Sequence, residues 1–202
     1  MENGTPLPFV GLFAIAFWTT YLWAFFVSEW GVVRRSKMSK PSDSAVPNGD
    51  ELGWMMGITL VAQALAIASA FWPTGRLSVE LQVPMFWLGI SLLLAGSALR
   101  QHCFRMLGEN FTIDVRASKN QPIIDHGAYA VVRHPGYTAG IMMLTGIGVA
   151  LGSLLSTLIM VSSALFVYIR RINFEERALE RVLGEKYRKY AASRKKLFPY
   201  VY

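Results

Sequence analysis

The sequence predicts an all-α integral membrane fold with about five transmembrane helices, because of its composition, its uncharged stretches and the placement of its basic residues. Hydrophobic residues make up 53% of the 202 residues and charged residues only 16%, and long uncharged stretches cover residues 7–28, 52–74 and 81–99. A bilayer core about 30 Å thick needs about 20 helical residues, so each stretch fits one crossing. Buried helices of a soluble protein are the alternative, but uncharged runs of this length indicate membrane spans.

A fourth uncharged stretch, residues 136–169, is 34 residues long. As one helix it would measure about 51 Å, too long for a single crossing, while two full crossings with a turn would need about 42 residues. Gly152 and Ser153 lie near its middle, and Gly146 and Gly148 allow helices to approach closely. The stretch therefore predicts a tight helical hairpin with arms at 136–151 and 154–174, whose second arm leaves the membrane still helical.

The basic residues supply an independent check through the positive-inside rule. Five spans with the N-terminus outside and the C-terminus cytoplasmic place 19 of the 20 Lys and Arg residues inside and only Arg76 outside, whereas four spans break this alternation. The first stretch lacks a preceding basic region, so we expect it to be retained as a span. The net charge of +7 lies mostly in the tail and favours anionic lipid headgroups over nucleic acid as a partner.

We expect residues 1–99 to form a three-span N-terminal membrane scaffold and residues 100–202 to form the catalytic half. In the latter, residues 172–193 have helical periodicity, with Phe174, Ala178 and Leu183 on one side and charges mostly elsewhere. This pattern predicts an amphipathic C-terminal helix along the membrane interface. A solvated tail is the alternative, because Gly184 weakens the helix.

The first chemically informative cluster contains Tyr129, Arg133, His134, Pro135 and Tyr137, at the mouth of the fourth span. Proline suits the first turn of a helix, so the hairpin is predicted to begin at Pro135 and to leave free amide donors close to His134. Such a helix end suits a carboxylate or phosphate, and His134 adds a group that titrates near neutrality. A lone interface histidine is usually incidental, but the neighbouring cation and tyrosines favour function.

The second cluster contains Arg171, Asn173, Glu175 and Glu176. Arg171 and Glu175 are four residues apart, so they share one helix face. Ionisable groups at membrane depth are costly and usually mark function, although a snorkelling arginine with an ordinary ion pair is the alternative. The predicted topology places both clusters on the same side of the membrane.

Together the clusters resemble the isoprenylcysteine carboxyl methyltransferase family, through Arg-His-Pro-x-Tyr-x-x-Gly, then Arg-x-x-x-Glu-Glu-x-x-Leu and Gly-x-x-Tyr-x-x-Tyr. The resemblance covers about residues 110–199, less than half of the chain, and related phospholipid methyltransferases and membrane sterol reductases have similar C-terminal halves. The matching residues are Arg133, His134, Pro135, Tyr137, Gly140, Arg171, Glu175, Glu176, Leu179, Gly184, Tyr187 and Tyr190.

The resemblance implies S-adenosyl-L-methionine bound at the cytoplasmic face. The cofactor contacts that it implies are Gln121, Ile123, Ile124, Tyr129, His134, Pro135, Tyr137 and Glu175. It also implies that Arg171 orients the carboxylate of the acceptor, so Arg171 and Glu175 are the predicted catalytic residues. Family members often have His where Gln121 stands. A sulfonium methyl group is already activated, so alignment rather than a catalytic base is the expected requirement.

The acceptor implied by the resemblance is the carboxylate of a prenylcysteine-like, lipophilic substrate, with a phospholipid headgroup or a thiol as alternatives. A reductase using NADPH and a non-catalytic membrane protein are less favoured, and the oligomeric state stays open. No metal site is expected, because His102 and Cys103 are adjacent and His126 is remote from both. No dinucleotide fingerprint is expected at Gly146-x-Gly148 because no strand precedes it.

Overall fold

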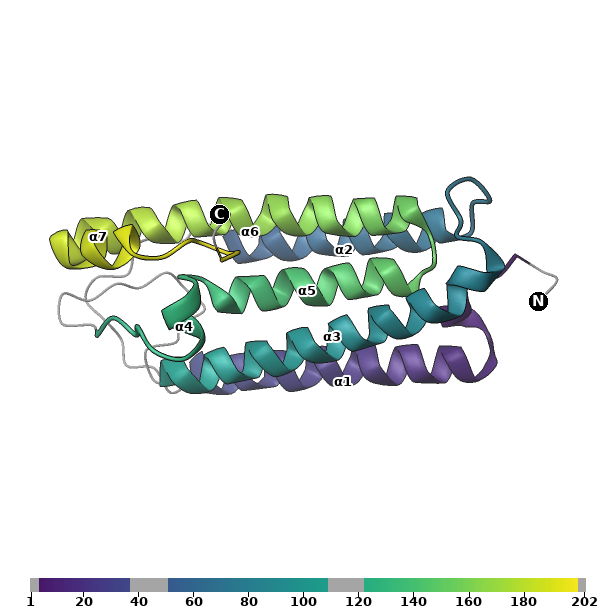
Figure 1. Cartoon of the computed structure of the whole chain (residues 1–202), viewed down its shortest axis with the longest axis horizontal. Helices are drawn as coiled ribbons and strands as arrows, with labels where there is room; N and C mark the ends of the chain where they lie inside the picture. Colours follow the sequence, from purple (N-terminus) through teal and green to yellow (C-terminus); the bar gives the residue numbers. More distant parts are fainter. Residues whose placement is uncertain (1–3, 37–50, 109–121, 200–202) are drawn as a thin grey trace.

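The computed structural model describes residues 4–36, 51–108 and 122–199. Its elements are η1 (Leu7–Phe9), α1 (Gly11–Ser36), α2 (Glu51–Ala70), α3 (Val79–Leu107), α4 (Ala128–Val131), α5 (Pro135–Ala150), α6 (Leu154–Leu183) and α7 (Glu185–Ala192). Helices α1, α2, α3, α5 and α6 lie side by side in an elongated bundle (Figure 1). The described residues form no strand, and the predicted all-α fold is confirmed.

Three of these helices are long and apolar enough to cross a membrane, namely the part of α2 from Gly53 to Ala70, α3 and α6. The part of α1 with described side chains, Gly11–Phe26, is a shorter apolar helix. Large apolar side chains such as Leu22, Leu60 and Leu158 are exposed on the outside of the bundle, as expected where lipid covers a helix. These features support integral membrane insertion, while the count of five crossings stays a prediction.

The predicted hairpin is present as α5 and α6, joined by residues 151–153. Gly152 has a φ of +68°, a backbone conformation that glycine adopts without strain, and the side chain of Ser153 caps α6 by accepting a hydrogen bond from the Ser156 amide. A Cβ on Gly146 would lie 2.6 Å from the carbonyl oxygen of Gly89 in α3. The small residues thus allow α5 to pack directly against the α3 backbone.

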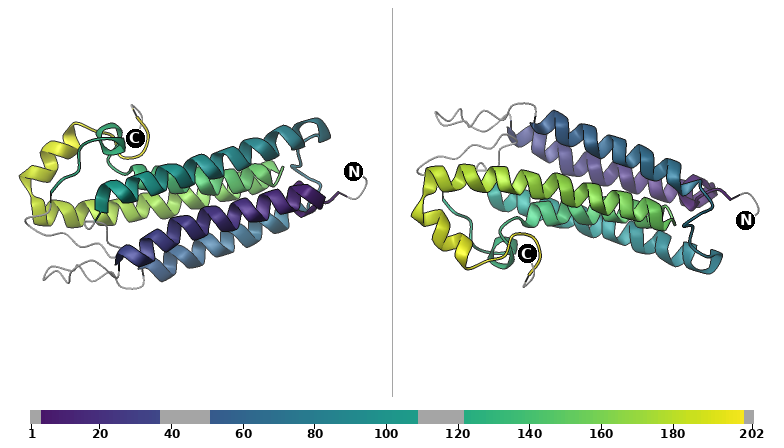
Figure 2. Two further views of the ribbon diagram at one scale, coloured as in Figure 1. Left: turned by 90° about the horizontal axis from the view of Figure 1, so that it is seen from below. Right: turned by 90° about the horizontal axis from the view of Figure 1, so that it is seen from above.

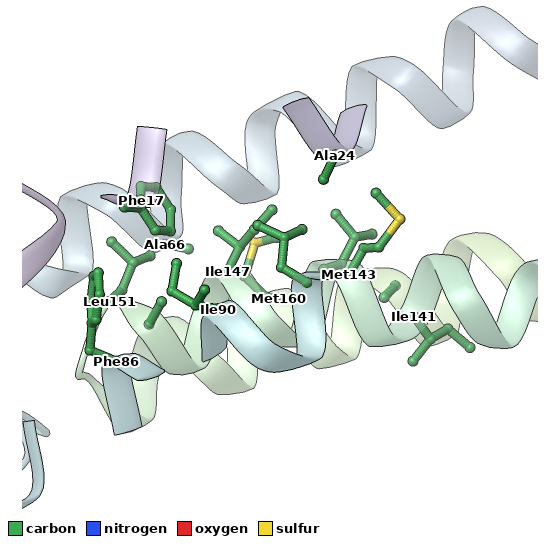
Figure 3. Packing of buried hydrophobic residues seen from close by; sticks show 14 of the residues in the cluster. Phe17, Ala24, Ala66, Phe86, Ile90, Ile141, Met143, Ile147, Leu151 and Met160 are labelled. Atoms are coloured by element: carbon green, nitrogen blue, oxygen red, sulfur yellow. The ribbon is translucent and has the colours of Figure 1, made fainter. Parts of the chain in front are cut away.

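Helix α5 lies at the centre of the bundle and carries much of its core. Phe86 and Ile90 of α3, Ile147 and Leu151 of the hairpin and Met160 of α6 are buried together (Figure 3). Helix α3 runs through the predicted boundary at residue 99, so the scaffold and the catalytic half share one continuous helix.

The amphipathic helix predicted over residues 172–193 is divided in two. Helix α6 continues to Leu183, and Gly184, with a φ of +53°, ends it. Helix α7 then turns back toward α4 (Figure 2), and residues 193–197, here termed the C-terminal strap, follow it. The glycine makes this reversal possible because its left-handed conformation is unfavourable for other residues.

The two ends of the bundle differ. The connection from α2 to α3 meets the hairpin turn at one end, where the Leu77 amide donates to the Gly152 carbonyl and the Leu154 amide to the Gly75 carbonyl. Helices α4 and α7 and the N-terminus of α5 lie at the other end (Figure 1). The two clusters singled out from the sequence therefore lie at one end, although the side of the membrane that this end faces stays a prediction.

Candidate active site

The two sequence clusters meet directly at the junction of α4, α5 and α6. His134 is the residue before α5, Pro135 occupies the first turn of that helix, and the His134 side chain is only 7% exposed. Its Nε2 lies 3.1 Å from Oε1 of Glu176 on α6, and the Arg133 Nε donates to the same oxygen at 2.8 Å. One carboxylate thus holds the two adjacent side chains at the start of the hairpin.

The neighbouring carboxylate, Glu175, has a different partner. The Tyr137 hydroxyl donates to Oε2 of Glu175 at 2.5 Å and accepts a hydrogen bond from Nε of Arg171 at 3.4 Å. Arg171 is 7% exposed, so this guanidinium is shielded from water. Arg171 and Glu175 share a helix face as predicted, and a tyrosine hydroxyl of α5 lies between them.

Three rings follow one another along the seam between α5 and α6. The rings of His134 and Tyr137 are 5.5 Å apart and nearly parallel, and those of Tyr137 and Tyr168 are 5.4 Å apart at 32°. Gly140 makes room for this row because a Cβ there would collide with the Tyr168 hydroxyl. The glycine of the first motif therefore has a packing role, and aromatic faces line the seam beside the charged groups.

The C-terminal strap holds the start of α5 in place. The amides of Arg133 and His134 donate to the Lys195 and Lys196 carbonyls at 2.9 and 3.0 Å, and the Thr138 hydroxyl donates to the Leu197 carbonyl at 2.8 Å. The Leu197 side chain is fully buried. These contacts satisfy the two backbone amides just before α5. Anion binding at the N-terminus of α5 stays a prediction.

Lys196 connects the strap to the same carboxylate that holds His134. Its Nζ lies 3.2 Å from Oε2 of Glu176 and donates to Oδ1 of Asn173 at 3.0 Å. Glu176 therefore faces three basic side chains within 3.2 Å, and its two oxygens are divided between them. We call Glu176, Arg133, His134 and Lys196 the Glu176 cluster.

The other predicted cofactor contacts belong to α4 and to the segment before it. Tyr129 is buried in α4, and burial raises the pKa of its phenol. Ile123 and Ile124 are half-buried in the segment before α4. The Arg194 guanidinium holds this segment by donating a hydrogen bond to the Asp125 carbonyl at 3.3 Å. Gln121 lies outside the described residues.

Sequence reasoning assigned no role to Glu176, Lys196 or Tyr187. Glu176 and Tyr187 belong to the motifs that the chain shares with the isoprenylcysteine carboxyl methyltransferase family, so the motifs marked these two residues without indicating their roles. Lys196 carried no signal, because nothing in its local sequence separates it from the neighbouring basic residues. Its place follows only from the reversal of the chain after Gly184.

Comparison with known proteins assigns the chain to a family. The sequence profile described as phospholipid methyltransferase matches residues 84–186, which include half of the chain and the two charged clusters. The chain belongs to the phospholipid methyltransferase family. The match begins in α3 and ends in the first turn of α7, so it contains α4, α5 and α6 completely.

Individual relatives show a more specific likeness. The chain is 27% identical over 141 residues to a probable protein-S-isoprenylcysteine O-methyltransferase of Oryza sativa subsp. indica, covering 65% of this chain and 74% of that one. It is 26% identical over 192 residues to the protein-S-isoprenylcysteine O-methyltransferase of Schizosaccharomyces pombe, covering 88% and 80%. The resemblance first seen in the motifs is confirmed.

A solved structure shares the fold. The eukaryotic intramembrane Ras methyltransferase ICMT superposes with a TM-score of 0.58 at 18% identity, over 94% of this chain and 64% of the solved one. The chain thus spans less than two thirds of that structure's length. Family, fold and apolar helices together identify an integral membrane methyltransferase.

Proposed function

We propose that the chain transfers a methyl group from S-adenosyl-L-methionine to the carboxylate of a prenylcysteine-like, lipophilic acceptor at the cytoplasmic face of a membrane. The observation that carries the proposal is the meeting of Arg171, Tyr137 and Glu175 beside the Glu176 cluster at one end of an apolar bundle. The relatives' names as isoprenylcysteine O-methyltransferases support the acceptor. The concentration of basic residues in the segments predicted to be inside supports the cytoplasmic face.

The groups around the two carboxylates fit S-adenosyl-L-methionine. That molecule has an ammonium group, a carboxylate, ribose hydroxyls and a cationic sulfur, and when bound it supplies an electrophilic methyl group. Glu175 offers acceptor oxygens, the rings of His134 and Tyr137 offer faces that attract cations, and the buried Tyr187 hydroxyl has no partner among the described residues. In this proposal Tyr129, His134, Pro135, Tyr137 and Glu175 hold the cofactor, together with Gln121, Ile123 and Ile124.

Arg171 is proposed to bind the acceptor. A guanidinium presents a rigid fork of donors that matches a carboxylate, and its attraction is stronger where the dielectric constant is low. Arg171 meets the second condition because its side chain is buried. A carboxylate acceptor is already an anion, so orientation is the main demand on the protein, and Tyr137 sets it by fixing Arg171 relative to Glu175.

A phospholipid headgroup amine is the second candidate acceptor, and the description of the matching family favours it. An ammonium headgroup would be repelled by Arg171, whereas its phosphate would be attracted. Purified protein in lipid nanodiscs, supplied with labelled S-adenosyl-L-methionine and either an N-acetyl farnesylcysteine acid or phosphatidylethanolamine, distinguishes the two. The proposal requires a base-labile labelled methyl ester on the first compound.

Two variants test the proposed division of labour. His134→Ala is expected to raise the dissociation constant for S-adenosylhomocysteine at least tenfold, because it removes a ring and a charged contact beside the proposed cofactor site. Arg171→Ala is expected to keep that constant within about twofold and to lower kcat/KM for the acceptor roughly 10- to 100-fold, the effect of one hydrogen bond to a charged group. Arg177→Ala, an exposed change on the same helix, serves as the control. Loss of cofactor binding in Arg171→Ala alone would refute this division.

A further inference from the structure

Tyr187 presents a buried hydrogen-bonding group that the fold does not use. The side chain is 6% exposed, and its hydroxyl is the one buried side-chain polar atom without a partner in the described part of the chain. Buried polar groups are nearly always hydrogen-bonded, because water is lost on burial and nothing replaces it. An isolated hydroxyl therefore needs an explanation.

The ring that carries this hydroxyl is held firmly. Tyr187 lies in the first turn of α7, directly after the reversal at Gly184. Its ring packs 6.2 Å from that of Tyr190, whose own hydroxyl donates to the Tyr129 carbonyl at 3.1 Å. The orientation of Tyr187 is thus set by packing, so the missing bond does not result from a free side chain.

The Tyr187 phenol lies near the charged groups of the site. Besides burial, the charges of Glu176, Arg133 and Glu175 influence its pKa. The Glu176 carboxylate lies near enough to help raise the pKa of the phenol, but its Oε1 is bound by Arg133 and His134 and its Oε2 by Lys196. The Tyr187 hydroxyl does not meet the geometry of a hydrogen bond to it. Burial raises the pKa of the phenol, so the group stays protonated and remains a donor.

We propose that Tyr187 is a further binding residue of the site, and that its hydroxyl donates a hydrogen bond to an oxygen or nitrogen acceptor atom of the bound methyl donor. This inference rests on the proposed function. The methyl donor is favoured over the methyl acceptor because Tyr187 lies near Glu175 and near Glu176, which contacts His134, and both His134 and Glu175 are proposed contacts of the methyl donor. Helix α7 thereby becomes part of the binding site.

The test compares Tyr187→Phe with the wild type in two measurements, thermal unfolding without ligand and equilibrium binding of S-adenosylhomocysteine. Deleting a hydroxyl that has no partner removes a desolvation penalty, so Tyr187→Phe should unfold at the same temperature as the wild type or higher. Its dissociation constant should rise about tenfold, the effect of one hydrogen bond.

Tyr21→Phe is the matched control, because its hydroxyl donates to Gln63 at 2.7 Å in the scaffold and is satisfied. This variant should unfold at a lower temperature and bind the ligand as the wild type does. A lower unfolding temperature for Tyr187→Phe with unchanged affinity would show that the hydroxyl has a structural partner, and would overturn the proposal. A rise only in the KM of the methyl acceptor would overturn the assignment to the methyl donor.

The proposed function and the role of Tyr187 can fail separately. If the wild type itself does not bind S-adenosylhomocysteine, the proposed function fails and the Tyr187 inference with it. If the wild type and Tyr187→Phe bind equally well, only the inference fails.

Discussion

Removing the carboxylate of Glu176 should destabilise the end of the bundle that holds α4 and α7 far more than removing a similar carboxylate nearby. Glu176 binds Arg133 at 2.8 Å, His134 at 3.1 Å and Lys196 at 3.2 Å, and its side chain is 16% exposed. Glu180, one turn further along α6, binds Arg188 at 2.9 Å but is 51% exposed. The two carboxylates lie on the same helix and differ chiefly in their burial and in the number of basic side chains that they bind. Glu180 is therefore a suitable control for Glu176.

The magnitudes follow from burial. Breaking a buried ionic network by removing one partner costs about 3–5 kcal/mol, and the residual exposure of Glu176 places the expected loss for Glu176→Ala near the lower end, about 3 kcal/mol. An exposed pair contributes roughly 0–1 kcal/mol, so Glu180→Ala should cost less than about 0.5 kcal/mol. For a chain of this size, 3 kcal/mol corresponds to a fall of roughly 6–12 °C in Tm.

Thermal unfolding of both variants in the same nanodiscs gives the first reading. Hydrogen exchange gives the second, because the Arg133 and His134 amides donate to the C-terminal strap and should lose protection in Glu176→Ala alone. Equal Tm values and unchanged protection in the two variants would contradict this prediction, since they would show that the three contacts of Glu176 stabilise the protein no more than an exposed ion pair does.

Two further predictions concern neighbouring parts of the site. Tyr137→Phe keeps the ring between its neighbours but removes the hydroxyl that joins Arg171 to Glu175, so kcat/KM should fall about tenfold. The Tm should also fall, by roughly 2–4 °C for a loss of about 1 kcal/mol. Steady-state kinetics beside a melting curve checks this, and unchanged kinetics would contradict it. Leu197→Ala should lower the free energy of unfolding by about 2–4 kcal/mol because the side chain is fully buried, whereas Phe198→Ala, at the exposed next position, should have little effect in the same denaturation assay.

Much of the fold could be predicted because membrane insertion leaves strong local signals. Uncharged stretches located the long helices, and Gly152 with Ser153 located the hairpin turn, because a glycine and a capping serine end one helix and begin the next. The start of α5 at Pro135 followed from the same kind of local rule. Each of these features depends on a few consecutive residues.

The pairing within the site could not be predicted in this way. Glu175 and Glu176 are adjacent, so on a helix they point about 100° apart and only one of them can face His134. Which one does so depends on how α6 is rotated against α5, and that is decided by distant contacts such as the place that Gly140 leaves for Tyr168. The sequence predicted that His134 and Glu175 both hold the cofactor, without a contact between them, and the direct contact of His134 in the structure is with Glu176.

The arrangement gives the two carboxylates separate sets of partners. Glu176 has its two oxygens bound by basic side chains of the α4–α5 junction and of the strap, so it fixes the position of His134 and joins the C-terminus to the hairpin. Glu175 instead meets the Tyr137 hydroxyl, which also contacts Arg171. A single adjacent pair on α6 can thus anchor the covering segments and border the proposed cofactor site at once. The length of α6 makes this possible, because the helix continues beyond the start of α5 and the extra turns are then covered by α7 and the strap.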